Sequence, residues 1–209
     1  MKNKKVIAGA LLGLFALNSF AASKNVTLQN QAINAANNVF GFLSPDQQNN
    51  IKLIVNAFSV YGDNDKSKLA YILATAWHES WLKPIKEFRA AQGTSLYNTQ
   101  NQYWYTGYYG RGFVQLTWQS NYKKMGDWLG IDLVNNPDLA LQPEVAAKIL
   151  VYGMVNGSFT GKKLSDYITG DYNDFYNARR IVNGLDQAQK INNYAINLTQ
   201  YAWKHYTPY

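Results

Sequence analysis

Two glutamates eight positions apart, Glu79 and Glu87, have the type and spacing for acid–base chemistry. The stretch around them is otherwise largely apolar, and its apolar residues from Leu69 to Ala76 recur at helical spacing. Glu79 emerges on the same, buried side of this helix. We therefore expect a poorly solvated carboxyl group whose pKa is raised, as a general acid near neutral pH requires.

The helix that carries Glu79 must end before Glu87 if the two groups are to meet. Asp65 is expected to cap its beginning and Pro84 to end it, because proline has no N–H and restricts the residue before it. An uninterrupted helix would hold the two carboxyls about 12 Å apart along its axis, whereas a turn can bring Glu87 back across a groove. An inverting glycosidase needs two carboxyls about 6.5 to 9.5 Å apart, with a water between them. The spacing leaves open the alternative of a surface Glu87 that pairs with Lys83, Lys86 or Arg89.

The N-terminus has the composition of a secretory signal peptide. Lys2, Lys4 and Lys5 precede an apolar run over residues 6–17, and small residues follow. We predict a signal peptide over residues 1–21, cut after Ala21 or Ala22, and an exported, periplasmic or extracellular protein. The run is short for a membrane span, so we expect no stable membrane insertion after cleavage; an uncleaved anchor is the alternative.

Composition excludes several functions. The net charge of +7 falls to about +4 without the three signal lysines, and the basic residues are scattered, which argues against nucleic-acid binding. The chain has no cysteine and two histidines, so we expect no thiol chemistry and no metal site. His78-Glu79 lacks the second histidine of the H-E-x-x-H metalloprotease pattern, and His78 is better explained as a packed, hydrogen-bonding residue.

The remaining chain predicts one mainly α domain with at most a short β-hairpin, formed by two lobes that flank a groove. Residues 22–43 are a tether or a marginal helix, and residues 44–209 form the catalytic domain. Ser44, Pro45 and Gln47 are typical of a helix start. Residues 89–109 form a long aromatic-rich loop, and the hairpin is expected within residues 103–116. Further helices are expected over residues 121–129, with Ser120 as cap, and over 145–155, 164–168, 175–182 and 186–205.

Several motifs in the same order resemble the family 19 glycoside hydrolases, which are chitinases and related phage-type cell-wall lysins of the lysozyme-like superfamily. The resemblance covers roughly residues 44 to 204. Its motifs read ATAWHE at 74–79, YYGRGFVQLTW at 108–118, NY at 121–122, DLVNNPDLA at 132–140 and RRIVNG at 179–184. It implies a lysozyme-like fold and no metal or organic cofactor.

The resemblance also implies roles for individual residues. Glu79 corresponds to the general acid, Glu87 to the base that activates water, and Thr117 to a serine that holds this water. The implied sugar-contacting residues are Trp104, Tyr109, Gln115, Asn121 and Asn183. The chain departs from the family where Ser80-Trp81 replaces a small, glycine-containing turn after the first glutamate.

The sequence thus predicts a secreted endo-hydrolase of β-1,4 bonds between N-acetylated aminosugars. Its substrate is chitin or the peptidoglycan glycan strand. A non-catalytic glycan-binding protein, or an antibacterial cell-wall effector whose partner is an inhibitor or immunity protein, is the alternative on the same fold.

Overall fold

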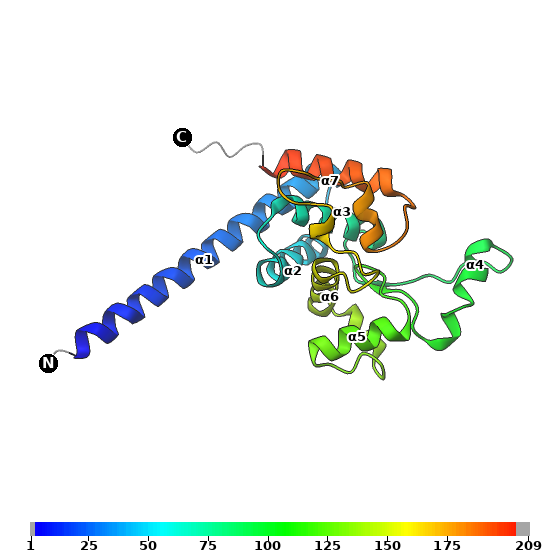
Figure 1. Cartoon of the computed structure of the whole chain (residues 1–209), viewed down its shortest axis with the longest axis horizontal. Helices are drawn as coiled ribbons and strands as arrows, with labels where there is room; N and C mark the ends of the chain where they lie inside the picture. The colour runs from blue at the N-terminus through cyan, green and yellow to red at the C-terminus, as the bar shows by residue number, and fades with distance from the viewer. Residues whose placement is uncertain (1–2, 204–209) are drawn as a thin grey trace.

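The structure, a computed structural model, describes the backbone of residues 3–203 and the side chains of residues 22–201. Over these residues it is mainly α, as predicted, with one two-stranded antiparallel sheet (Figure 1). Its helices are α1 (Asn3–Phe40), α2 (Pro45–Tyr61), α3 (Lys66–Ser80), α4 (Ser95–Gln100), α5 (Gln119–Leu129), α6 (Pro143–Asn156) and α7 (Ala188–Trp203), its strands are β1 (Ile85–Lys86) and β2 (Arg111–Gly112), and its 3-10 helices are η1 (Trp104–Thr106), η2 (Pro137–Leu141), η3 (Leu164–Asp166) and η4 (Asn177–Ile181).

The core lies where α3 packs on α7, α2 packs on α6, and the second half of α1 packs on both α2 and α7. Residues 22–40 are helical, and small or branched side chains of this segment are buried: Ala32, Ile33, Ala35 and Ala36. The first half of α1 extends away from this body (Figure 1). Within residues 22–201, no helix is long and apolar enough to cross a bilayer.

The first two core helices begin as the sequence predicts. Ser44 and Gln47 form a reciprocal capping box at the start of α2, and the Asp65 carboxylate accepts from the Ser67 N–H at the start of α3. Both caps satisfy N–H groups that have no partner within the helix.

The end of α3 differs from the prediction, because the helix stops at Ser80 rather than at Pro84. Trp81 and Leu82 both adopt left-handed backbone conformations, with φ of 52° and 56°. The Leu82 N–H donates to the Ala76 carbonyl, which closes the helix. Leu82 is fully buried, and Asn50 donates to its carbonyl over 2.9 Å. Burial of Leu82 therefore ends the helix at Ser80, before the chain reaches Pro84.

The strand pairing also differs from the prediction. β2 lies within residues 103–116 as expected, but its partner β1 comes from residues 85–86, with Lys86 opposite Arg111. Arg111 additionally forms an isolated antiparallel bridge with Leu116. The segment between the strands was predicted to be irregular, yet it contains α4 and η1 and projects from the body (Figure 1).

The C-terminal half is close to expectation. α5 begins after Trp118, whose φ is 74°, and not after a Ser120 cap, while Gly130 ends it in a left-handed conformation. The helices expected over residues 164–168 and 175–182 are shorter 3-10 helices, η3 (Leu164–Asp166) and η4 (Asn177–Ile181). The predicted end of the last helix at His205 lies outside the described residues.

Candidate active site

An open groove of about 580 Å³ brings together segments that are far apart in the sequence. The end of α3 contributes His78 and Glu79, and the β1 strand is followed directly by Glu87. The remaining wall comes from the chain around α4, the segment from β2 into the start of α5, the loop after α6, and the region from η4 to the start of α7: Leu96, Thr99, Tyr103, Val114, Gln115, Leu116, Thr117, Trp118, Asn121, Phe159, Arg179, Val182, Asn183 and Asp186.

Glu79 faces the groove with a cationic partner. Its side chain is 16% exposed, and its Oε1 accepts from the Arg179 guanidinium over 2.5 Å. Arg179 is 3% exposed and is held by a second bond from its Nε to the Asp186 carbonyl. Among the described residues, no hydrogen bond reaches Glu79 Oε2. This oxygen is therefore available to meet a ligand in the groove.

Glu87 has different surroundings from Glu79. Its Oε1 accepts from Gln100 Nε2 over 2.8 Å and from the Tyr103 hydroxyl over 2.7 Å, and its Oε2 accepts from the Gly110 N–H over 2.9 Å. All three partners donate, which matches the acceptor-only, ionised form of a carboxyl group. Burial and the bond to Glu87 raise the pKa of Tyr103, so this phenol keeps the proton that it donates.

The cations next to Glu87 in the sequence bind other groups. Lys86 pairs with Asp138, and Arg89 donates to side-chain oxygens of Gln100 and Asn101. The geometry therefore disfavours the alternative in which Glu87 is a surface residue neutralised by a neighbouring lysine or arginine.

His78 lines the groove beside Glu79. Desolvation lowers its pKa below the ordinary value, Glu79 opposes this shift, and the positive charge of Arg179 adds to it. No hydrogen bond to its ring occurs within the described side chains, so the predicted hydrogen-bonding role is not supported there. The imidazole is a partly buried, neutral member of the groove wall.

Three of the predicted site residues are tied to the backbone of the groove wall. Gln115 Nε2 donates to the carbonyls of Ile85 and Gly112, both over 3.0 Å, which fixes the turn after β2 against β1. The Thr117 hydroxyl donates to the Gln115 carbonyl, and Asn121 Nδ2 donates to the Thr117 carbonyl, both over 2.9 Å. The Thr117 hydroxyl can therefore still accept a hydrogen bond from the groove.

Asn183 lines the groove from the segment after η4. It is exposed, and its Oδ1 accepts from the Gly184 N–H over 2.8 Å. Its amide nitrogen remains free to donate to a ligand.

Trp104 and Tyr109 are not among the described residues that line the groove. Their rings stack on each other instead, with centroids 4.6 Å apart and planes 20° apart. A flat ring that faces another ring does not offer that face to a sugar.

Four residues with close contacts to the site were not assigned to it from the sequence. Arg179 pairs with Glu79, and Gln100 and Tyr103 hold Glu87. Trp118 is 44% exposed on the groove wall, and its ring meets the Tyr103 ring edge-on at 5.2 Å. Arg179 and Trp118 lie within the quoted motifs, but only the fold shows which members of a motif reach the groove.

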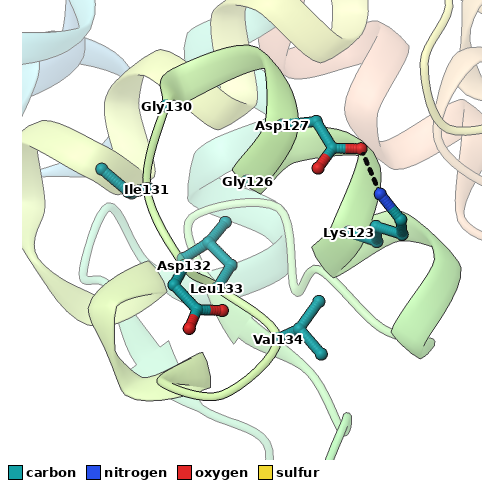
Figure 2. A pocket seen from close by; sticks show the side chains of 8 residues that line it. All are labelled: Lys123, Gly126, Asp127, Gly130, Ile131, Asp132, Leu133 and Val134. Carbon is teal, nitrogen blue, oxygen red and sulfur yellow. Dashed lines mark hydrogen bonds and ion pairs between the residues drawn. The ribbon is translucent and has the colours of Figure 1, made fainter.

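The hollow at the end of α5 has fewer side chains suited to catalysis than the groove. A hollow of about 330 Å³ lies where α5 ends (Figure 2). Its Lys123 and Asp127 pair with each other over 2.6 Å, and Asp132 binds Asn135. Within the described residues, no three acidic or histidine side chains gather as a metal ligand set.

Comparisons with known proteins point to one family. A family profile for glycoside hydrolase family 19, described as chitinase class I, matches residues 13–187. An acidic 27 kDa endochitinase of Solanum lycopersicum is 31% identical over 118 residues, which are 55% of this chain and 48% of that protein. An inactive chitinase-like protein 1 of Hevea brasiliensis is 41% identical over 66 residues, which are 31% of this chain and 21% of that protein. The chain thus covers less than half of the length of either relative.

Solved structures agree in fold. Chitinase C from Streptomyces griseus HUT6037 superposes with a TM-score of 0.57 at 26% identity, over 80% of this chain and 74% of that chain. A further bacterial family 19 chitinase gives a TM-score of 0.51 at 23% identity, which shows the fold alone. The predicted lysozyme-like, mainly α fold is therefore confirmed.

Proposed function

Because this chain belongs to glycoside hydrolase family 19, the chitinase class I family, we propose that it hydrolyses β-1,4 bonds between N-acetylated aminosugars with inversion. The observation that carries the proposal is that Glu79 and Glu87, from separate segments, line one open groove with different partners. Two carboxyls in different environments can divide the roles of acid and base.

In this mechanism Glu79 donates a proton to the glycosidic oxygen as the bond from that oxygen to the anomeric carbon breaks. A water attacks the anomeric carbon from the opposite face and gives its proton to Glu87. Thr117 would hold this water by accepting a hydrogen bond, since its own proton goes to the Gln115 carbonyl. Arg179 keeps Glu79 oriented through its Oε1 and leaves Oε2 for the substrate.

The proposed groove contacts come from the two walls. Asn121 and Asn183 would bond sugar hydroxyls or acetamido groups, and Gln115 would hold the wall itself through its two backbone bonds. Trp118 would supply the stacking surface, because its indole is exposed in the groove wall.

Chitin is the first substrate to test, because relatives of this chain are named endochitinases. The peptidoglycan strand is the second, since it shares the β-1,4 backbone. One relative is named an inactive chitinase-like protein, and this keeps glycan binding without turnover as a second candidate function.

The decisive experiment compares Glu79→Gln with the wild type on chitin oligomers and on cell walls. We expect turnover to fall by more than about 100-fold, because the proton donor is lost, while thermal unfolding and oligomer binding persist. Glu144→Gln is the matched control, since this third glutamate is exposed at the start of α6 and lies outside the groove. Unchanged turnover in Glu79→Gln would rule out its role, and wild-type binding without turnover would support the glycan-binding alternative.

We also propose that residues 1–21 direct export and are removed. This rests on their basic start and apolar run. Mass spectrometry of the chain recovered outside the cytoplasm tests it: we expect a new N-terminus after Ala21 or Ala22, and an intact Met1 would contradict it.

A further inference from the structure

Trp104 and Tyr109 lie five residues apart, and their rings stack across the turn at Gly107, whose φ is 83°. Trp104 begins η1 in the segment that projects between the strands, and Tyr109 lies two residues before β2. Their stacked rings, 4.6 Å apart, therefore tie the end of the projection to the start of the second strand. Stacked aromatic pairs of this kind contribute about 0.5 to 1.5 kcal/mol beyond their burial.

The neighbours of the two stacked residues hold the two oxygens of one carboxylate. Tyr103, directly before Trp104, donates its hydroxyl proton to Glu87 Oε1 over 2.7 Å. Gly110, directly after Tyr109, donates its N–H to Glu87 Oε2 over 2.9 Å. The stacked pair therefore adds a side-chain contact between these two donors. Two hydrogen bonds also hold this turn, from the Glu87 N–H to the Gly110 carbonyl and from the Tyr122 hydroxyl to the Tyr109 carbonyl.

Two arginines extend the stack on its two sides. The Arg89 guanidinium lies 4.9 Å from the Trp104 ring centroid, and the Arg111 guanidinium lies 4.0 Å from that of Tyr109. Arg111 is 4% exposed, and its Nε donates to Asp138 over 2.8 Å. Arg111 therefore anchors Tyr109 to the body of the protein, and cation–π contacts of this geometry are attractive.

We propose that Trp104 and Tyr109 are positioning residues for Glu87 rather than sugar-contacting residues. The proposal rests on the proposed function for the role of Glu87 as base, and it replaces the sugar contacts that the family resemblance implied for this pair. The ring faces are occupied by each other and by the arginines, and neither ring lines the groove.

The kinetic test compares substitutions that remove the stack with substitutions that keep it. Trp104→Leu and Tyr109→Leu keep much of the volume but lose the aromatic faces, and we expect kcat to fall roughly 100-fold, as for a misplaced catalytic group, with KM changed less than about 2-fold. Tyr109→Phe and Trp104→Phe retain a stacked ring and should keep kcat within about 3-fold. Tyr172→Leu, which changes an aromatic residue that is 65% exposed and lies outside the groove, is the control and should match the wild type. A rise in KM without loss of kcat would overturn the proposal.

Two further measurements do not depend on turnover. Oligosaccharide affinity is measured in a Glu79→Gln background, where the leucine variants should bind as tightly as their parent; a 10-fold loss would restore the sugar-contacting role. Hydrogen exchange at the Gly110 amide should accelerate at least 10-fold in the leucine variants and remain slow in the phenylalanine variants. Unchanged exchange would overturn the proposal. If the wild type turns over neither polymer, the proposed function fails, while this exchange result still decides whether the stack holds Glu87.

Discussion

At the residue scale, the two glutamates differ in what surrounds them. Glu79 has one charged partner and one uncommitted oxygen, whereas both oxygens of Glu87 are occupied by donors. Such a difference is how two identical side chains can serve opposite proton-transfer roles. The neighbouring His78 is the residue whose environment makes a direct pH prediction.

We expect His78 to lower the free energy of unfolding in mild acid. Burial lowers the pKa of His78 in the folded state, so below about pH 6.5 the unfolded chain binds the additional proton. The stability that depends on neutral His78 is therefore present above that pH and is lost as pH falls below it, by at most about 1.4 kcal/mol per pH unit. Urea unfolding of wild type and His78→Gln at pH 7 and pH 5 checks this. Equal losses of unfolding free energy in the two proteins would contradict it.

At the element scale, the short sheet matters for the residues that flank its strands rather than for its size. β1 leads directly into Glu87, and Gly110 directly precedes β2. The Glu87 N–H donates to the Gly110 carbonyl over 2.8 Å, so this backbone pairing also sets the position of the carboxylate. A side chain at Gly110 would meet Gln115 Oε1 at 2.8 Å and the Glu87 Cβ at 3.2 Å.

Gly110→Ala should therefore damage activity more than stability. The added methyl displaces Glu87 or Gln115, and a displacement approaching 1 Å at a catalytic group costs roughly 100-fold in rate. Gly184→Ala is the control, since a methyl there meets no atom within 4 Å and its φ is not left-handed. Steady-state kinetics on chitin oligomers, with melting temperatures of both variants, measure the effect. A wild-type kcat in Gly110→Ala would contradict this prediction, because it would mean that the added methyl group does not misplace Glu87.

At the scale of the whole molecule, the second half of α1 belongs to the core and supports the site. Phe40 stacks on Trp77 with centroids 4.3 Å apart and meets Tyr194 of α7 edge-on at 5.3 Å. Trp77 directly precedes His78 and Glu79. The helix α1 thus contacts α3 one residue before the groove-lining His78.

Phe40→Ala should lower the free energy of unfolding by about 2 to 3 kcal/mol, because it removes a partly buried ring from the junction of three helices. Phe42→Ala, two residues on, removes a ring that is 92% exposed and should change stability by less than about 0.5 kcal/mol. Chemical denaturation of the two variants in parallel gives both values. Similar losses in both would mean that α1 does not depend on the Phe40 stack.

The sequence by itself determined the local features of this protein. The caps at Ser44 and Asp65 and the left-handed Gly130 follow from interactions among near neighbours, and apolar spacing is enough to predict helices. The motifs also indicated the family, and they contain Glu79 and many of the residues that line the groove.

The tertiary structure decided the features that depend on distant partners. The α3 end at Ser80 results from burial of Leu82 against α2, the strand partner comes from residues 85–86, and Arg179 reaches Glu79 from 100 positions away. The stacking of the Trp104 ring on the Tyr109 ring likewise depends on the folded backbone. The type of a residue limits the contacts that it can make. Packing then determines which of these contacts form, because the energies of burial and pairing depend on all of the neighbours.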